Sequence, residues 1–246
     1  AALGALIAVM TVLATPALAF DHQPWDDLLQ AHVSEHRDGV ASAVDYDGMA
    51  ADQAALDDYL ARLSAVDNAT FKGFSNDQKL AFLINAYNAF TVKLILKQDS
   101  RPDSIRDIGS IFSGPWSQRF FTLLGEERTL DELEHQMIRG NPSLMDPRIH
   151  FAVNCASVGC PALRPEAYTG EWLDAQLADS TRRFLSDRRR NRYDAEAGVL
   201  RVSSIFDWYQ EDFEDSAGGL GDYLLQYADA LALPAEARRN LEAGDL

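Results

Sequence analysis

Basic residues are scarce in this sequence relative to acidic ones. Its 246 residues carry 22 Lys and Arg against 38 Asp and Glu, which gives a net charge of −16 at neutral pH. The phosphates of nucleic acids bind basic surfaces, so this balance excludes a nucleic-acid-binding role. It also argues against adsorption to an anionic membrane face. The partner that we expect is a small molecule or another protein, and the composition identifies neither.

Charged residues are absent from the first 19 positions. An apolar run over 6–13 precedes Ala17-Leu18-Ala19, the small-x-small pattern that signal peptidase accepts. The run is too short to span a bilayer comfortably, and we expect no later segment to be apolar enough to do so. We therefore predict a signal peptide over 1–19 and a periplasmic or secreted protein without stable membrane insertion after cleavage. A retained N-terminal anchor is the alternative, because no positively charged residue precedes the apolar run.

Cysteine is rare, and the chain has no low-complexity tract, internal repeat or recognisable linker. Cys155 and Cys160 are its two cysteines. Their spacing differs from the Cys-x-x-Cys pair that is usual in redox sites, and we expect no cofactor. The residues from 20 to 246 are enough to bury one good core, so we predict a single domain over that range.

Hydrophobic periodicity predicts a helix-rich α+β fold with a small antiparallel sheet. Ser75 and Gln78 match a capping box, and apolar residues then appear on every side of the following helix. We therefore predict a central buried helix at 76–98. The other predicted helices are 24–36, 49–63, 129–139, 171–185, 205–213, 220–230 and 234–241. The predicted strands are 44–46, a hairpin at 119–129 around Gly125, and a pair at 192–194 and 199–202.

Two asparagines lie three residues apart on the predicted buried helix. A buried amide without partners costs about 1–3 kcal/mol, so Asn85 and Asn88 must be hydrogen-bonded. They either brace the backbone of a neighbouring loop, or one of them orients a catalytic histidine or donates to an oxyanion. The residue pattern alone leaves both interpretations open.

An ionisable residue interrupts the apolar stripe of the helix predicted at 129–139. Glu134 falls on that stripe, where an ionised side chain is costly unless it is paired. His135 follows it, and Arg139 lies one turn further on. The three residues form either a structural network or half of an acid/base site, since histidine titrates near neutral pH.

The segment DPRIHFAVNCASVGC at 146–160 has an ambiguous secondary structure. Asp146-Pro147 is typical of a helix start, whereas the residues after it favour a strand. In either conformation His150 and Asn154 lie side by side. Cys155 then lies near both of them in the sequence.

Three segments resemble one known family. NAYNAFTVKLIL at 85–96, LDELEHQMIR at 130–139 and DPRIHFAVNCASVGCPALR at 146–164 are similar to domain-of-unknown-function family number 547, in that family's order. The resemblance covers about 45–215 and implies an exported member of bacterial type. It brings no catalytic role with it. The residues that its motifs gather are Asn85, Asn88, Glu134, His135, Arg139, His150, Asn154, Cys155 and Ser157.

The first functional hypothesis is a binding or structural role. An exported protein matures in an oxidising compartment, where Cys155 and Cys160 are expected to pair in a disulfide. The polar residues of the motifs then form a ligand pocket or a satisfied network. The binding residues under this hypothesis are Asn85, Asn88, Arg139 and Ser157.

The second hypothesis is a thiol-dependent hydrolase or transferase. Cys155 attacks, His150 or His135 acts as its base, and Asn154 or Glu134 orients the imidazole. A metal site built from Glu134, His135, His150 and Cys155 is a third candidate. The spacings among those four residues match no common metal motif, so we predict no metal.

Overall fold

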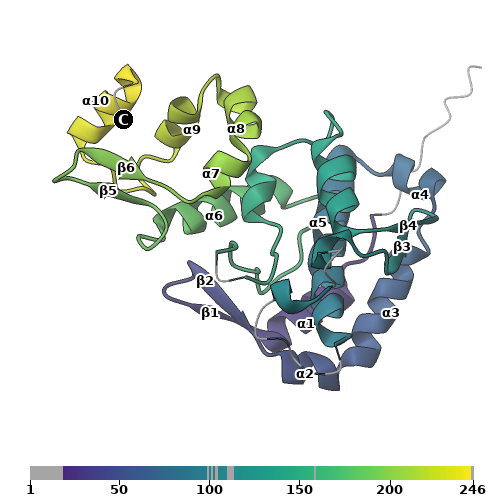
Figure 1. Cartoon of the computed structure of the whole chain (residues 1–246). Helices are drawn as coiled ribbons and strands as arrows, with labels where there is room; N and C mark the ends of the chain where they lie inside the picture. The colour runs from purple at the N-terminus through teal and green to yellow at the C-terminus, as the bar shows by residue number, and fades with distance from the viewer. Residues whose placement is uncertain are drawn as a thin grey trace, which may run out of the picture.

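The computed structural model describes residues 19–98, 100, 102, 105–109, 114–157 and 159–244. The predicted leader therefore lies outside the described residues, apart from Ala19. The described chain is helix-rich α+β, as predicted (Figure 1). Its strands form three separate two-stranded antiparallel hairpins, where the sequence predicted one small sheet.

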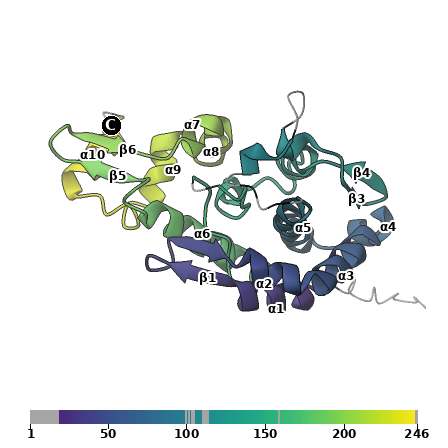
Figure 2. The same cartoon turned by 60° about the horizontal axis from the view of Figure 1, so that its bottom comes forward.

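Helix α5 (Asn76–Leu96) is the central element, as predicted. Ser75 accepts a hydrogen bond from the Gln78 backbone, and the Gln78 side chain accepts one from the Ser75 N–H, which completes the capping box. Every residue from Leu80 to Val92 is buried. Figure 2 looks nearly along α5 and shows other elements around it. The helix is apolar on all sides because it packs on all sides.

One prediction about this helix is corrected. We expected no segment after residue 19 to be apolar enough to cross a membrane. Asn76–Leu96 is 21 residues long with a mean hydropathy of 1.3, which meets that requirement by length and composition. In the fold, however, 83% of its apolar stretch is buried inside the protein. The surrounding elements bury α5, so in this fold it is a core helix.

The N-terminal elements differ in detail from the prediction. The first helix, α1 (Gln23–His32), ends four residues early, because β1 (Val33–His36) pairs with β2 (Ala41–Val44). Arg37, Asp38 and Gly39 have φ values of 53°, 58° and 81° and reverse the chain between the two strands. The predicted strand at 44–46 is therefore displaced. The helices that follow are α2 (Tyr46–Ala51), α3 (Gln53–Ser64) and α4 (Asn68–Gly73).

The middle of the chain contains two unusual helices. After the predicted hairpin of β3 (Phe121–Leu123) and β4 (Glu126–Arg128) comes η3 (Glu132–Arg139), which is a π-helix. The ambiguous segment then forms a short 3₁₀-helix, η4 (Pro147–Phe151), and continues without regular structure. It is thus neither strand nor α-helix. The remaining short 3₁₀-helices are η1 (Ile105–Asp107) and η2 (Pro115–Ser117).

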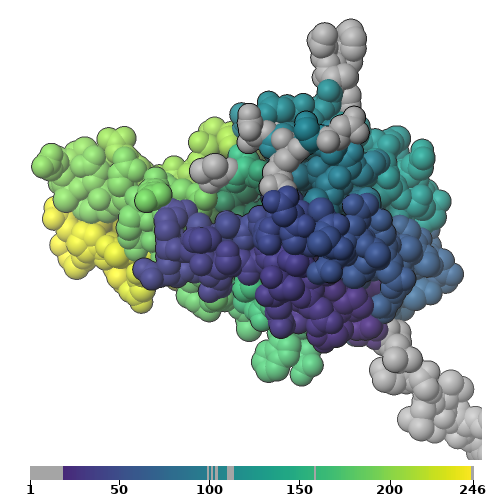
Figure 3. All heavy atoms as spheres, turned by 90° about the horizontal axis from the view of Figure 1, so that it is seen from below, coloured from purple at the N-terminus to yellow at the C-terminus, as the bar shows by residue number. Residues whose placement is uncertain are grey.

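Buried side chains form two clusters. The larger core surrounds α5, and the smaller one gathers aromatic residues such as Phe151, Phe206 and Phe213. The elements of the C-terminal part are α6 (Leu173–Ser186), β5 (Arg192–Asp194), β6 (Val199–Arg201), α7 (Ile205–Trp208), α8 (Gln210–Ala217), α9 (Leu220–Gln226) and α10 (Ala235–Ala243). Figure 3 shows the first helices covering one face, with the C-terminal segments at one end. The single domain over 20–246 stays a prediction.

Candidate functional site

Three predicted site residues meet two unpredicted ones in a polar cluster, which we define as Glu134, Arg139, His150, Tyr209 and Asp212. Asp212 on α8 is its centre. Its Oδ2 accepts a hydrogen bond from His150 Nε2 at 2.7 Å and one from Arg139 Nε at 2.6 Å. Its Oδ1 accepts from Arg139 Nη2 at 3.1 Å, so the guanidinium binds the carboxylate with two nitrogens.

Tyr209 joins the same cluster from the start of α8. Its hydroxyl donates to Glu134 Oε1 at 2.8 Å, and its ring stacks on His150 with centroids 3.8 Å apart. Arg139 Cζ lies 4.9 Å from the centre of the Tyr209 ring. These contacts join η3 and η4, next to the larger core, to α8 in the smaller core. The pairing that Glu134 requires at a buried position is therefore supplied by Tyr209.

The local charges favour one protonation state of the cluster. Burial opposes ionisation of Asp212, but hydrogen bonds from His150 and Arg139 outweigh it and lower the pKa of Asp212 to about 2. Burial also lowers the pKa of His150 below its usual 6.5, although Asp212 acts in the opposite direction. At neutral pH, Asp212 is thus ionised and His150 is neutral, donating from Nε2.

The π-helix positions two members of the cluster. The Gly140 N–H bonds to the carbonyl of His135, five residues earlier, instead of four as in an α-helix. This wider turn brings residues five apart, such as Glu134 and Arg139, towards one face. π-Helical turns are rare and occur frequently at functional sites, which makes η3 a feature that sequence periodicity did not predict.

The side chains of the cluster bind mainly to one another, and its histidine is buried. The His150 side chain is 1% exposed, and its Nδ1 has no hydrogen-bond partner among the described residues. His135 is exposed beside the cluster, with its Nδ1 3.1 Å from Arg139 Nη1. Apart from His150 Nδ1, the polar groups of the cluster are satisfied by one another, which is the behaviour of a structural network.

The stability of the protein is expected to fall in acid because of two buried histidines. Burial lowers the pKa of His22 from 6.5 to about 4 and lowers that of His150 in the same direction. Both contributions are complete above the unfolded pKa of about 6.5 and are lost as pH falls below it. Asp212, with its pKa lowered to about 2, adds a further loss below about pH 4.

We expect His22 alone to cost about 3 kcal/mol of unfolding free energy between pH 7 and pH 4. Urea denaturation at several pH values measures this. His22→Gln and His150→Gln should each flatten the profile, whereas His36→Gln, at an exposed position, should leave its slope unchanged. A stability that does not change from pH 7 to pH 4 would contradict the prediction.

The two buried asparagines brace backbone, as the first of their two interpretations predicts. Asn85 Nδ2 donates to the Tyr168 carbonyl at 2.7 Å, and Asn85 Oδ1 accepts from the Tyr168 N–H at 3.0 Å. Asn88 Nδ2 donates to the Ala152 carbonyl at 3.0 Å, and Asn88 Oδ1 accepts from the Asn154 N–H at 2.8 Å. The amide groups of both side chains are thus used inside the fold.

The two cysteines are joined in a disulfide, with their Cα atoms 5.9 Å apart. Asn154 holds this loop closed, because its Oδ1 accepts from the Ala156 N–H and its Nδ2 donates to the Pro161 carbonyl. Ser157 contributes a backbone carbonyl that accepts from the Cys160 N–H. Neither nitrogen of His150 makes a hydrogen bond to Cys155 among the described residues. Cys155 therefore has no free thiol in this structure.

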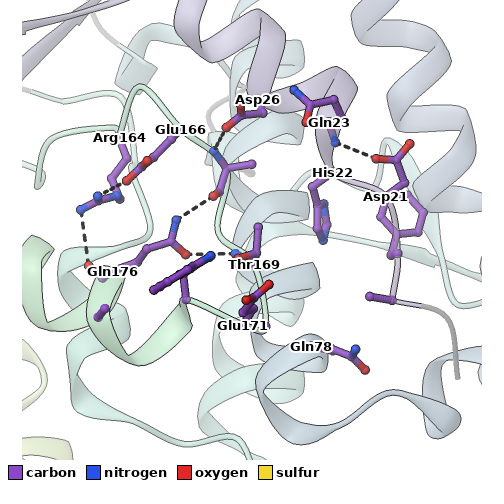
Figure 4. Close-up of a pocket in the computed structure, with 16 residues that line it drawn as sticks. Asp21, His22, Gln23, Asp26, Gln78, Arg164, Glu166, Thr169, Glu171 and Gln176 are labelled. Carbon is purple, nitrogen blue, oxygen red and sulfur yellow. Dashed lines mark hydrogen bonds and ion pairs between the residues drawn. The ribbon is translucent and has the colours of Figure 1, made fainter. Parts of the chain in front are cut away.

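A pocket lies apart from the polar cluster. Its volume is about 780 Å³, and three stretches of chain form its walls (Figure 4). Asp21 and His22 lie on one side of the view, with Arg164 and Gln176 on the other. The lining residues are Ala19, Phe20, Asp21, His22, Gln23, Asp26, Gln78, Arg164, Glu166, Ala167, Thr169, Gly170, Glu171, Trp172, Ala175 and Gln176.

The pocket wall over 164–176 is held in place by hydrogen bonds. Gln176 Nε2 donates to the Ala167 carbonyl at 2.8 Å, and Gln176 Oε1 accepts from the Thr169 N–H at 3.0 Å. Asp26 of α1 accepts from the Ala167 N–H at 2.8 Å. The backbone of Gly170 runs so close to α5 that an added Cβ would lie 3.0 Å from a backbone nitrogen. The wall is thus preformed rather than loose.

Sequence reasoning missed the residues that complete the cluster and all those of the pocket. Tyr209 and Asp212 lie 75 and 62 residues from the partners Glu134 and His150. The sequence did contain a signal for Asp212, because this acidic residue lies between the aromatic residues Tyr209 and Phe213 at a short helix. The pocket had no such signal, since its walls are formed by separate segments of ordinary composition.

Comparison with known proteins agrees with the motif analysis. The model of the family described as "Protein of unknown function, DUF547" matches residues 71–185. This match supports the predicted family. The matched segment contains α5, the π-helix, the disulfide loop and most of α6. It is shorter than the range of 45–215 over which we predicted the resemblance. Tyr209, Asp212 and the N-terminal side of the pocket lie outside the DUF547 match. No curated protein and no solved structure matches the chain.

Proposed function

We propose that this protein binds a small organic molecule in the pocket, and that the polar cluster joins its two cores. The pocket carries the proposal. Its volume of about 780 Å³ lies within the usual range of ligand sites, roughly 300–1,000 Å³. Trp172 lines it with 61% of its surface exposed, which is unusual for so large an apolar side chain. An exposed aromatic beside several polar groups is typical of ligand recognition.

One residue of the DUF547 motifs, Asn85, supports the pocket wall from inside the fold. Asn85 holds the backbone of Tyr168, which lies between the lining residues Ala167 and Thr169. Helix α5 also supplies Gln78 to the lining. Asn85 thus acts as a positioning residue for the pocket wall, and the polar cluster orients the C-terminal part.

A thermal-shift screen tests the proposal with a panel of amines, amino acids, sugars and nucleotides at roughly 1 mM. A compound at a hundred times its Kd should add about 2.7 kcal/mol to stability, a shift of several degrees in Tm. Trp172→Ala should abolish the shift. Trp208→Ala is the matched control, because Trp208 is 65% exposed and lines no part of the pocket. A shift that persists in Trp172→Ala, or no shift with any compound, would overturn the proposal.

We also propose that the protein is exported to the periplasm or beyond. The uncharged apolar leader and Ala17-Leu18-Ala19 support this, together with the disulfide. N-terminal sequencing of the protein from a secreting bacterial host should find Phe20 as the first residue. A chain that keeps its leader would instead favour the membrane anchor.

The competing proposal is a thiol-dependent hydrolase or transferase that uses Cys155 with His150 or His135. It requires reduction of the disulfide, since the nucleophile is the thiolate. We expect purified protein to show no reactive thiol without reductant and two after reduction, measured by thiol titration. A single fast-reacting thiol that disappears in Cys155→Ser would contradict this expectation and support the thiol-dependent enzyme.

A further inference from the structure

Two of the four carboxylates that line the pocket are paired with cations. Asp21 pairs with Arg62 at 2.9 Å, and Glu166 pairs with Arg164. Arg164 also pairs with Asp179 at 2.6 Å. The guanidinium in the described lining is therefore occupied by two carboxylates and is not free to bind an anion.

The other two carboxylates are balanced by helix N-termini. Asp26 lies in the first turn of α1, and Glu171 directly precedes the N-cap of α6. Each helix N-terminus is equivalent to about half a positive charge, and α5 also begins at the pocket. A chain that begins at Phe20, as proposed above, adds its α-ammonium to the same wall. The lining as a whole therefore carries little net charge and favours neither a cation nor an anion.

One large apolar surface of the pocket is available to a ligand. Trp172 is 61% exposed, and no described residue makes a ring or cation contact with it. The Phe20 ring is already in use, because it packs edge-on against Phe82 and Tyr59 and lies beneath Arg62. The other lining residues are polar or are alanine and glycine. A ligand that is apolar on all sides therefore does not match this lining.

Polar groups with unused hydrogen-bonding capacity lie beside Trp172. Glu171 precedes it in the chain, is exposed and makes no hydrogen bond or ion pair to a described residue. A Cβ added at Gly170 would lie 2.6 Å from Gln78 Cγ, so Gln78 lies next to this segment. Gln78 Oε1 accepts from the Ser75 N–H, whereas Gln78 Nε2 donates to no described residue. The pocket thus offers an acceptor at Glu171 and a donor at Gln78.

A flat apolar surface with a donor and an acceptor at its edge matches one class of uncharged molecule. One face of a pyranose ring consists of C–H groups, which are attracted to the electron-rich face of an indole. The hydroxyls around that face can donate to a carboxylate and accept from an amide. A flat heterocycle also stacks on tryptophan, but both of its faces are apolar and the described lining has one free aromatic side chain. A volume of about 780 Å³ accommodates a ligand of drug size, such as a disaccharide.

We infer that the pocket binds an uncharged carbohydrate, with one pyranose ring stacked on Trp172 and its hydroxyls bound by Glu171 and Gln78. This inference rests on the binding function proposed above and names the chemistry of its ligand. Because the ligand carries no charge, its affinity should change little with salt concentration. The affinity of an ionic ligand would instead fall as the salt concentration rises.

Isothermal titration of the protein starting at Phe20, with a C-terminal tag, tests the inference. The disaccharide probes are maltose, cellobiose and N,N′-diacetylchitobiose. Putrescine, succinate and adenosine are the cationic, anionic and aromatic comparison molecules. We expect at least one disaccharide to bind about ten-fold or more tightly than each comparison molecule. Its Kd should differ by less than about two-fold between roughly 0.05 and 0.5 M salt.

Matched variants show which residues are responsible. Trp172→Ala should abolish disaccharide binding, whereas Trp172→Phe, which keeps an aromatic face, should retain part of it. Glu171→Ala should weaken binding about ten-fold. Gln78→Glu keeps the capping box but removes the amide donor, so it should weaken binding several-fold. Trp208→Ala and Glu242→Gln, at exposed positions outside the pocket, should bind like the wild type.

The outcomes separate this inference from the binding function. Disaccharide binding that survives Trp172→Ala unchanged would overturn both. If putrescine, succinate or adenosine alone binds and Trp172→Ala abolishes this, the binding function stands and the carbohydrate inference fails. If no probe binds, the carbohydrate inference fails, and the broader screen decides the binding function.

Discussion

Replacing Asp212 with alanine is expected to lower the free energy of unfolding by about 3 kcal/mol. The substitution leaves the buried His150 Nε2 and the Arg139 guanidinium without their shared acceptor. Removal of one partner from a buried charge network typically costs about 3–5 kcal/mol. The lower end applies because the Asp212 side chain is 14% exposed and water can reach the site. Urea denaturation measures the loss.

The same helix offers the control for this experiment. Asp215 is exposed on α8 and has no partner among the described residues, so Asp215→Ala should change stability by less than about 0.5 kcal/mol. If Asp212→Ala is as stable as Asp215→Ala, the polar cluster does not join the two cores. Ligand binding adds a second readout. A purely structural cluster predicts that Asp212→Ala keeps its affinity for pocket ligands at temperatures where the variant remains folded.

Asn88→Ala is expected to destabilise the protein by a similar amount, about 3 kcal/mol. It removes a donor from the Ala152 carbonyl and an acceptor from the Asn154 N–H. Each backbone group left buried without a partner costs about 1–3 kcal/mol. Ala152 is 2% exposed, so water cannot replace the lost amide there. Asn154 also shapes the disulfide loop, so that loop should become easier to reduce.

Two measurements check this second prediction. Chemical denaturation gives the stability, and the rate at which a thiol reductant opens the Cys155–Cys160 bond reports on the loop. Asn76→Ala is the control, because Asn76 lies on the same helix at an exposed position. An Asn88→Ala protein with wild-type stability and an unchanged reduction rate would show that the two amide bonds contribute little.

Local patterns predicted the elements whose partners are close in sequence. The capping box of Ser75 and Gln78 depends on residues three apart, and the structure contains it. The hairpin around Gly125 depends on its own turn, and it is present as predicted. The first helix was predicted too long because β1 is stabilised by β2, which follows a turn that helical periodicity does not register. Short-range signals are therefore reliable where short-range contacts decide the structure.

Another part of the site was predicted from polar residues at apolar positions. Asn85, Asn88 and Glu134 stood in apolar positions, and a buried polar group must find a partner. That argument predicted that partners exist and left their identity open. For the asparagines they are backbone groups 64 to 83 residues away. The catalytic interpretation of the cysteine was open for the same reason, since spacing alone does not distinguish a thiol from a disulfide.

The sequence by itself determined the composition class, the helix-rich α+β fold, the central buried helix and the need to pair Glu134. These depend on periodicity and on the cost of burying polar groups, and both can be read locally. Only the tertiary structure decided that Asp212 and Tyr209 complete the cluster, that the cysteines pair, and that Trp172 faces a pocket. The physical reason is that contacts between distant segments are set by the packing of whole elements, which no local pattern records.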